Sequence, residues 1–272
     1  GGMGPTDYGM RKPDGPGGAS TYDIFIDNKD LWVAHGGYTE KWTTQGNGSG
    51  FSNLQNDKWK NYELYKYRGF GDSIRDLTRI VKGSDGTIYA GSFGKGLFVI
   101  NPDGTTENYA GNSILDPSVT GSGILVSGLA LDNNGNLWMN LFGGNHELAV
   151  RTADKNWYEF SIPVSRPIPH AAANVLIDDN GQKWFVGPLG GGVMVYNDNG
   201  TIESEADDSY RALFSGKGNG GLPDNDAHCL AKDRNGAIWI GTSNGIGIVN
   251  CPGQVIEREC ESELRVVQYD DF

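Results

Sequence analysis

The side chains that could catalyse a reaction occur without the arrangement that catalysis requires. No strand-to-helix elbow is evident that would present a serine or cysteine nucleophile. The adjacent carboxylates Asp207-Asp208 and Asp270-Asp271 would lie in loops or point to opposite faces of a strand, so neither pair could share acid and base work. The sequence therefore predicts a protein that is not an enzyme.

The histidines and the acidic turns lack the spacing of metal ligands. None of the four histidines forms a His-x-x-x-His pair, although a ring of sheets could bring distant ones together. They are His35, His146, His170 and His228. In Asp132-Asn133-Asn134 and Asp178-Asp179-Asn180, the glycine that follows comes too early for an EF-type calcium loop, so both read better as turns. We expect neither a metal nor a cofactor.

Aromatic residues in a long polar loop are the remaining candidates for binding. Residues 37–51 carry Tyr38, Trp42 and Phe51 among glycines and polar side chains. Exposed rings in such a loop would suit stacking on sugars or contact with a protein partner. The loop could equally pack onto its own sheet, and the connection 207–221 leaves the same two possibilities open.

These loops must be positioned by a repeated unit, and five segments share one pattern of an apolar run, a turn of the Asp-x-Asn-Gly kind and an aromatic residue. The segments are 24–33, 77–90, 129–138, 175–184 and 229–239. Their aromatic anchors are Trp32, Tyr89, Trp138, Trp184 and Trp239. Subtracting their numbers gives spacings of 57, 49, 46 and 55 residues, close to the roughly 40–50 residues of a propeller blade.

The pattern predicts an all-β fold, a β-propeller of four-stranded antiparallel blades with five blades visible. The apolar run forms the inner strand, glycine supplies the turn, and the aromatic ring of the second strand packs between neighbouring sheets. The predicted outer strands are 59–65, 105–109, 157–160, 201–205 and 264–269. The predicted blades are 21–66, 73–110, 124–162, 170–206 and 224–270, after a Gly/Pro-rich approach segment, 1–20. Because both ends fall on blade boundaries and exposed sheet edges are usually protected, we expect the blades to belong to a larger ring.

Charge and hydropathy exclude several classes of partner. The formal net charge of −12 and the absence of a basic stripe argue against nucleic acid. No apolar run approaches the length of a membrane span, and residues 1–5 lack the regions of a signal peptide, so we expect a mature form or a piece of something longer.

The three cysteines indicate a compartment. Cys251 and Cys260 flank a short, turn-rich segment suited to a local disulfide, which would place the protein in an oxidising environment, the periplasm or the cell surface. Cys229 lies in an apolar run and is predicted to be a small buried side chain.

Two resemblances follow from these motifs. Residues 222–245, which include Asp233-Arg234-Asn235-Gly236-Ala237-Ile238-Trp239-Ile240-Gly241-Thr242, resemble the two-component regulator propeller repeat. That repeat occurs in sensor domains of hybrid histidine kinases and in other exported Bacteroidetes proteins. Residues 245–272, together with 32–38 and 59–62, resemble the PorZ-type propeller proteins of the type IX secretion system, which are longer and have more blades and a C-terminal sandwich.

The resemblance implies a periplasmic or surface accessory of the secretion machinery, with an envelope protein or an anionic lipopolysaccharide as partner. It assigns no ligand residue, because no motif matches a binding site. The alternative hypothesis is a periplasmic ligand-sensing propeller of a hybrid two-component regulator. A third is a polysaccharide-active propeller enzyme, which would need carboxylates from several blades to converge on the central pocket.

Overall fold

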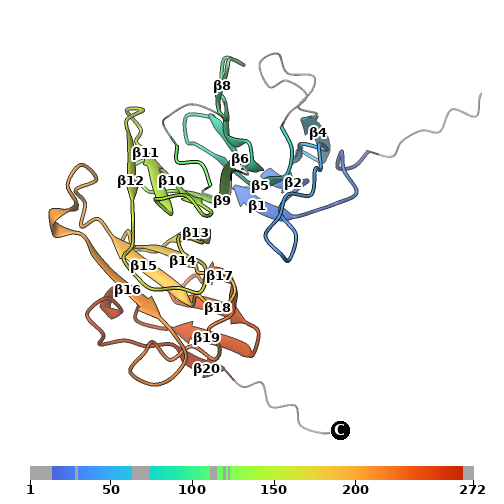
Figure 1. Ribbon diagram of the computed structural model, residues 1–272. Coiled ribbons are helices and arrows are strands. Elements are labelled where there is room, and N and C mark those ends of the chain that lie inside the picture. Colours follow the sequence, from blue (N-terminus) through green and yellow to red (C-terminus); the bar gives the residue numbers. More distant parts are fainter. Residues whose placement is uncertain are drawn as a thin grey trace, which may run out of the picture.

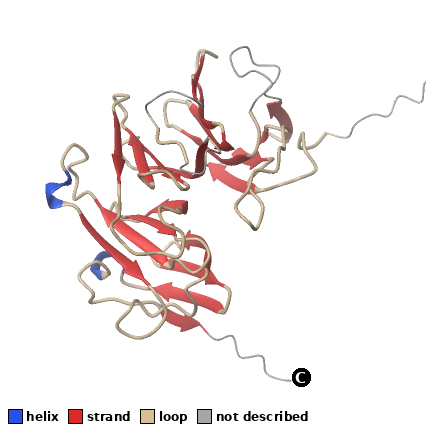
Figure 2. Cartoon of the chain, viewed as in Figure 1, coloured by secondary structure: helices blue, strands red, loops and turns tan. Residues whose placement is uncertain are grey.

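The computed structural model describes residues 14–27, 30–62, 74–110, 115–118, 121 and 123–265. Over these residues the regular structure consists of β-strands and two short 3-10 helices, so the predicted all-β class is confirmed (Figure 2). No helix among the described residues is both long and apolar enough to cross a membrane.

The strands form five consecutive antiparallel groups of four, which we call sheets 1 to 5. Sheet 1 contains β1 (Asp23–Asp27), β2 (Asp30–Ala34), β3 (Phe51–Gln55) and β4 (Lys58–Tyr62). Sheet 2 contains β5 (Leu77–Lys82), β6 (Ile88–Gly94), β7 (Gly96–Ile100) and β8 (Thr106–Tyr109). Sheet 3 contains β9 (Ile124–Leu131), β10 (Leu137–Leu141), β11 (Leu148–Arg151) and β12 (Trp157–Phe160). Sheet 4 contains β13 (Ala173–Ile177), β14 (Lys183–Val186), β15 (Val193–Asn197) and β16 (Ser209–Leu213). Sheet 5 contains β17 (Ala227–Lys232), β18 (Ile238–Thr242), β19 (Gly245–Val249) and β20 (Glu263–Arg265).

Each sheet is a meander in which every strand pairs with the next one along the chain. Sheets 2 and 3 are additionally joined, because the end of β6 pairs with the start of β9 through Phe93 and Leu125. The five sheets follow one another around an arc, with sheets 1 and 5 at its two ends (Figure 1). This radial repetition of four-stranded meanders is the architecture of a β-propeller.

The first turn of the repeat is held by its aspartate. In sheet 4, Asp178 Oδ1 accepts hydrogen bonds from the backbone N–H groups of Asn180 and Gln182, at 2.8 and 2.9 Å. Its other oxygen, Oδ2, accepts from the indole Nε1 of Trp184 at 3.0 Å, while Gly181 supplies the positive φ of +78° that the turn needs. The same indole bond recurs in the pairs Asp132–Trp138 and Asp233–Trp239, at 3.1 and 3.0 Å. One carboxylate therefore fixes both the turn and the orientation of the anchor ring.

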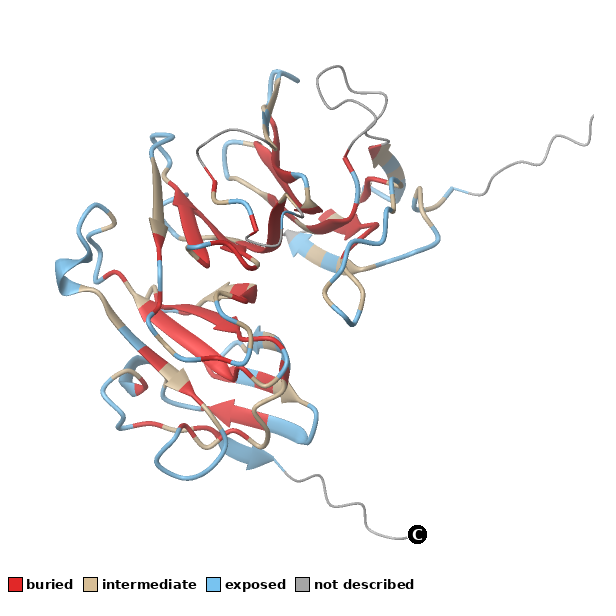
Figure 3. Cartoon of the chain, in the orientation of Figure 1, coloured by how far each residue is buried: buried red, intermediate tan, exposed pale blue. Residues whose placement is uncertain are grey.

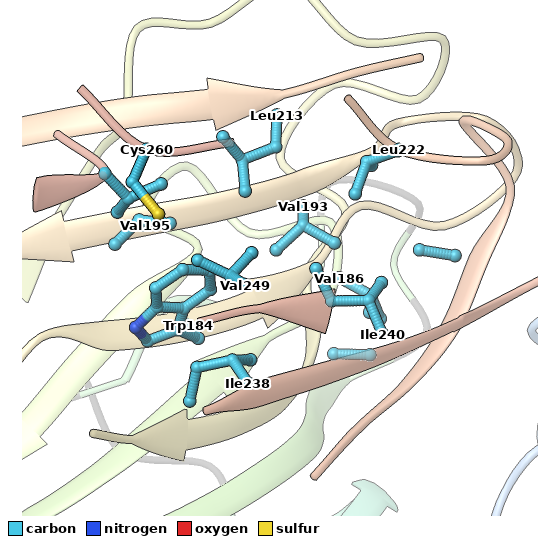
Figure 4. Packing of buried hydrophobic residues seen from close by; sticks show 13 residues of the cluster. Trp184, Val186, Val193, Val195, Leu213, Leu222, Ile238, Ile240, Val249 and Cys260 are labelled. Carbon is cyan, nitrogen blue, oxygen red and sulfur yellow. The ribbon is translucent and has the colours of Figure 1, made fainter. Parts of the chain in front are cut away.

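The core lies between the sheets, where four hydrophobic clusters join each sheet to the next (Figure 3). In each case the anchor aromatic of one sheet faces the sheet that follows. Trp184 of sheet 4, for example, packs with Val193 of its own sheet and with Ile238 and Val249 of sheet 5 (Figure 4). The first four anchors, Trp32, Tyr89, Trp138 and Trp184, are 3%, 7%, 0% and 0% exposed.

The fifth anchor departs from the prediction. Trp239 is 39% exposed, so it is not packed between two sheets. The reason is geometric: each anchor is covered by the following sheet, and no described sheet follows sheet 5. Ile246 of β19 pairs with Gly241, which in turn pairs with Cys229, so these three residues lie on the same face of sheet 5 as Trp239. Ile246 is also exposed.

Cys229 lies on the same uncovered face, and this corrects a second expectation. Cys229 pairs with Gly241, and two residues further along, on the same face of the sheet, Ala231 pairs with Trp239. The side chain of Cys229 therefore lies beside Trp239. The thiol is free and exposed, so the prediction of a buried Cys229 is wrong. Its burial would need a further sheet packed against Trp239.

The outer strand of sheet 4 lies later in the chain than predicted. Residues 201–205 form turns, in which the N–H of Ser204 donates to the carbonyl of Thr201, and lead into the 3-10 helix Glu205–Asp207. The strand that pairs with β15 is β16, and sheet 4 therefore extends to Leu213. The predicted outer strands 59–65 and 264–269 coincide in part with β4 and β20, and residues 63–65 and 266–269 lie outside the described residues.

A disulfide between Cys251 and Cys260 closes the connection between β19 and β20. Arg211 of β16 holds this connection against sheet 4, since its Nη1 donates to the backbone carbonyls of Val255 and Cys260 at 2.7 and 2.9 Å. The bridge is thus part of the contact between sheets 4 and 5.

An acidic group at the junction of sheets 2 and 3 makes stability depend on pH. Burial alone would raise the pKa of Glu107, but hydrogen bonds from Tyr109, Asn101 and Lys155 and the charge of Arg151 lower it to about 2. Because the pKa is lower in the folded than in the unfolded state, the stabilisation is complete above the ordinary glutamate pKa of 4.5 and is lost as the pH falls toward 2. We expect Glu107→Gln to flatten the decline of Tm between pH 5 and pH 2, as followed by circular dichroism. Parallel curves for variant and parent would contradict this assignment.

Candidate binding site in the central channel

The inner strands of all five sheets line a central cavity of about 620 Å³. Its wall is formed by β1, β5, β9, β13 and β17, the strands that lie nearest the shared axis. A cavity of this size, lined by elements from every blade, is within the range of small-molecule and glycan sites. It is the site at which a ligand would contact the largest number of blades.

The charges in this cavity are concentrated on the side of sheets 1 and 2. Arg79 of β5 donates to both oxygens of Asp23 on β1, at 2.8 and 2.9 Å, and its guanidinium carbon lies 5.8 Å from the centre of the Phe25 ring. The Nζ atom of Lys82 lies 3.4 Å from Oδ2 of Asp30 on β2. Two cations therefore line the cavity of a protein whose net charge is −12.

A polysaccharide-active enzyme would need carboxylates from several blades to converge on this cavity, and within the described part of the chain they do not. Of the described residues that line the cavity, Asp23 alone carries a carboxylate, and Arg79 binds both of its oxygens. A paired acid and base of the glycosidase kind requires two carboxyl groups on either side of the bond to be cleaved.

The loop between β2 and β3 crosses from sheet 1 to the other sheets. The ring of Tyr38 packs 4.7 Å from that of Phe93 in sheet 2, and the ring of Trp42 stacks 5.0 Å from that of Phe142, which follows β10 of sheet 3. Trp42 also packs against the cluster between sheets 4 and 5. Tyr22, which lines the cavity, contacts Tyr38 at 5.1 Å. The loop therefore lies beside the cavity and links sheet 1 to the rest of the arc.

Asp76 holds this loop in one conformation. Its buried carboxylate accepts hydrogen bonds from three successive backbone N–H groups, those of Gln45, Gly46 and Asn47, at 3.1, 2.8 and 2.8 Å. Arg75 donates to the carbonyl of Gly46 at 3.1 Å. The loop is thus preorganised by the residues that lead into β5.

The three predicted ligand-binding aromatics do not form one exposed platform. Phe51 is 1% exposed and stacks on Tyr62 with ring centres 4.4 Å apart, so its assignment to a binding site is wrong. It begins β3 and belongs to the core between sheets 1 and 2.

Tyr38 and Trp42 do lie together, stacked 4.2 Å apart. Trp42 is enclosed between Tyr38 on one side and Phe142 on the other. Burial raises the pKa of Tyr38 to about 12, so its hydroxyl stays neutral. The sequence left open exposure for binding or packing of the loop onto its own sheet, whereas Tyr38 and Trp42 pack on Phe93 of sheet 2 and on Phe142 beside sheet 3.

A Gly-x-Ser-x-Gly match that sequence reasoning passed over, Gly241 to Gly245, joins β18 to β19. Ser243 Oγ donates to Asp226 at 2.9 Å and lies 2.7 Å from His228 Nε2. The Asp226 carboxylate and the His228 imidazole thus both lie within hydrogen-bond distance of the single hydroxyl of Ser243. The motif lies in a hairpin turn, unlike the strand-to-helix turn of hydrolases.

Comparison with known proteins agrees with this architecture. Residues 221–244 match the two-component regulator propeller family. The structure superimposes with a TM-score of 0.76 and 25% identity on PorZ, described as an essential bacterial surface component of the type IX secretion system of Porphyromonas gingivalis, covering 92% of this chain and 35% of that one. This chain thus spans about a third of that protein's length. Among curated proteins, none matches.

Two further solved structures share the fold at lower identity. The extracellular domain of a putative hybrid two-component system from B. thetaiotaomicron has a TM-score of 0.60 at 16% identity over 84% of this chain and 27% of that one. An inactive virginiamycin B lyase from Staphylococcus aureus also has a TM-score of 0.60, at 16% identity over 92% of this chain and 71% of that one. These likenesses establish the β-propeller fold. The chain therefore resembles two-component regulator propellers in its repeat and PorZ over most of its length.

Proposed function

We propose that this chain is part of an exported, non-catalytic β-propeller that serves the type IX secretion machinery as an accessory or scaffold component. The observation that carries the proposal is the likeness to PorZ, which extends over 92% of the chain at 25% identity. The disulfide between Cys251 and Cys260 agrees with an oxidising compartment, the periplasm or the cell surface.

The central cavity is the proposed site for an envelope partner, either a protein or an anionic glycan such as lipopolysaccharide. The long-range charge of the protein repels an anion, whereas Arg79 and Lys82 attract it at the cavity. Their carboxylate partners, Asp23 and Asp30, hold both side chains in place while leaving 35% and 28% of them exposed.

Gene deletion with complementation tests the proposal. Deletion in the parent bacterium is expected to leave cargo of the type IX system in the periplasm, and the wild-type gene to restore its release. An allele with Arg79→Ala and Lys82→Ala is expected to restore less than about a tenth of that release, given that a charged hydrogen bond contributes about 1.5–3 kcal/mol. The matched control removes two exposed cations away from the cavity, Lys217→Ala and Arg234→Ala, and should restore release fully.

Two outcomes would contradict parts of the proposal. Unchanged cargo release after deletion would remove the secretion role. If the cavity pair and the control pair reduced cargo release equally, the cavity would not be the binding site, and the effect would come from the overall charge of the protein. Binding of purified lipopolysaccharide to the wild-type protein, weakened by the cavity pair alone, assigns the partner as a glycan, whereas no binding assigns it as a protein.

A ligand-sensing propeller of a hybrid two-component regulator is the second candidate, favoured by the family match at residues 221–244. The same deletion distinguishes it. A sensor would leave secretion intact and abolish the transcriptional response to its ligand, which RNA sequencing would detect.

A further inference from the structure

Three potential metal ligands meet beside sheet 3, away from the central cavity. Asp116 lies in the connection between sheets 2 and 3, His146 in the loop between β10 and β11, and Glu159 on β12. Their ligand atoms all lie within 4.8 Å of one another. His146 Nδ1 lies 2.6 Å from Asp116 Oδ2 and 3.5 Å from Glu159 Oε2, so one nitrogen faces two carboxylate oxygens.

The local backbone permits this close approach. A Cβ on Gly144 would lie 3.3 Å from Cβ of Asp116, and one on Gly143, whose φ is +70°, would lie 3.1 Å from Ser118 Oγ. Two consecutive glycines therefore let the 115–118 connection lie directly on the loop that carries His146. Glu159 fixes the same connection, since its Oε1 accepts the backbone N–H of Asp116 at 3.0 Å.

The donor set favours a cation. Two carboxylates that face one imidazole repel each other, and a divalent ion between them would offset that repulsion. One nitrogen with two oxygens suits Zn²⁺ or another first-row divalent metal, whereas Ca²⁺ takes six to eight oxygen ligands. The His146 side chain is 42% exposed, which leaves room for water to complete the coordination.

We propose that Asp116, His146 and Glu159 form a binding site for a divalent first-row transition metal, with Zn²⁺ as the probe. The metal would replace the proton between His146 Nδ1 and Asp116 Oδ2, which is released to solvent, and would be held by these two atoms and by Glu159 Oε2. It pins the connection between sheets 2 and 3 to the rim of sheet 3, so metal binding stabilises the junction of these two blades. This site does not depend on the proposed secretion role.

Isothermal titration with ZnCl₂ tests the site in tag-free, chelator-treated protein that carries Cys229→Ser, because the exposed thiol would otherwise bind zinc. We expect one ion per chain and a rise in Tm. Substitution of a residue that only hydrogen-bonds to a metal ligand weakens metal binding by about 10- to 100-fold. Because His146 is itself a ligand, His146→Ala should weaken zinc binding at least as much. The matched control is His228→Ala, which removes an exposed histidine paired with a single carboxylate, Asp226, at 3.7 Å.

Glu159→Gln is the second variant, because its amide oxygen can still accept the N–H of Asp116. It should fold like the parent, as judged by Tm without metal, and should weaken zinc binding at least about tenfold. The proposal is overturned if the parent shows no saturable binding, if His146→Ala and Glu159→Gln bind zinc like the parent, or if His228→Ala weakens binding equally.

Discussion

Trp184→Ala is expected to lower the free energy of unfolding by about 3–5 kcal/mol, the usual cost of truncating a buried tryptophan. Trp184 is fully buried between sheets 4 and 5, and its loss would also leave Asp178 without the indole N–H. The same change at the fifth anchor, Trp239→Ala, should cost about 1 kcal/mol or less, because 39% of that residue is already exposed to water. Urea unfolding followed by circular dichroism measures both.

The two variants are matched, because each indole donates to the aspartate of the first turn in its own sheet. Trp184 donates to Asp178 and Trp239 to Asp233, both at 3.0 Å. The two anchors differ in their cover: sheet 5 packs on Trp184, whereas no described sheet packs on Trp239. If a further blade covers sheet 5 in a longer chain, Trp239→Ala should become about as costly there as Trp184→Ala. Similar costs for both variants in the present chain would disprove the rule that each anchor is stabilised by the sheet after it.

The blades could be predicted from the sequence because their signals are local. Asp178, Gly181 and Trp184 lie within seven residues of one another, and their spacing alone specifies a hairpin with its ring bound to its turn. Burial of the anchor is not local. Nothing in the segment around Trp239 distinguishes it from Trp184, because the exposure of Trp239 depends on there being no sheet after sheet 5 among the described residues.

The errors at the outer strand and the loop have related causes. An outermost strand pairs on one side only, so the short polar segment 201–205 and β16 are about equally suited to the outer position in the sheet. The side-chain and backbone hydrogen bonds of the turn decide which segment takes that position. Phe51 was assigned to the loop because the strand start cannot be located within a glycine-rich stretch. Its register opposite Ala34 places it in the core.

The clusters that could do chemistry were the least predictable part. Asp116, His146 and Glu159 are separated by 30 and 13 residues, and their meeting depends on how the connection between two blades lies on a loop of the third. Gly143 and Gly144 follow the second strand of sheet 3 and are typical of a loop, but they do not indicate what would pack on it. Spacing rules for metal sites apply within one element, whereas this group comes from three.

A buried ion pair between Glu147 and Arg166 lies at the entry to sheet 4. The Glu147 carboxylate is fully buried; its Oε1 accepts the N–H of Ile162 at 3.0 Å and is bonded to Arg166 Nη2, and its Oε2 lies 3.1 Å from His170 Nδ1. Arg166 also donates to the carbonyl of Ala171 at 3.2 Å. The pair thus ties the 161–172 connection to sheet 3.

Arg166→Ala is expected to destabilise the protein by about 3–5 kcal/mol, because it leaves a carboxylate buried without its cation. Removing both charges should be far milder. In Glu147→Gln with Arg166→Met, the amide oxygen still accepts the Ile162 N–H and the methionine fills the space of the arginine stem, so we expect a loss of about 1–2 kcal/mol. Urea midpoints for the parent, the single and the double variant measure this difference. A double variant as unstable as Arg166→Ala would show that packing of the arginine stem, and not compensation of the buried charge, stabilises the passage from sheet 3 to sheet 4.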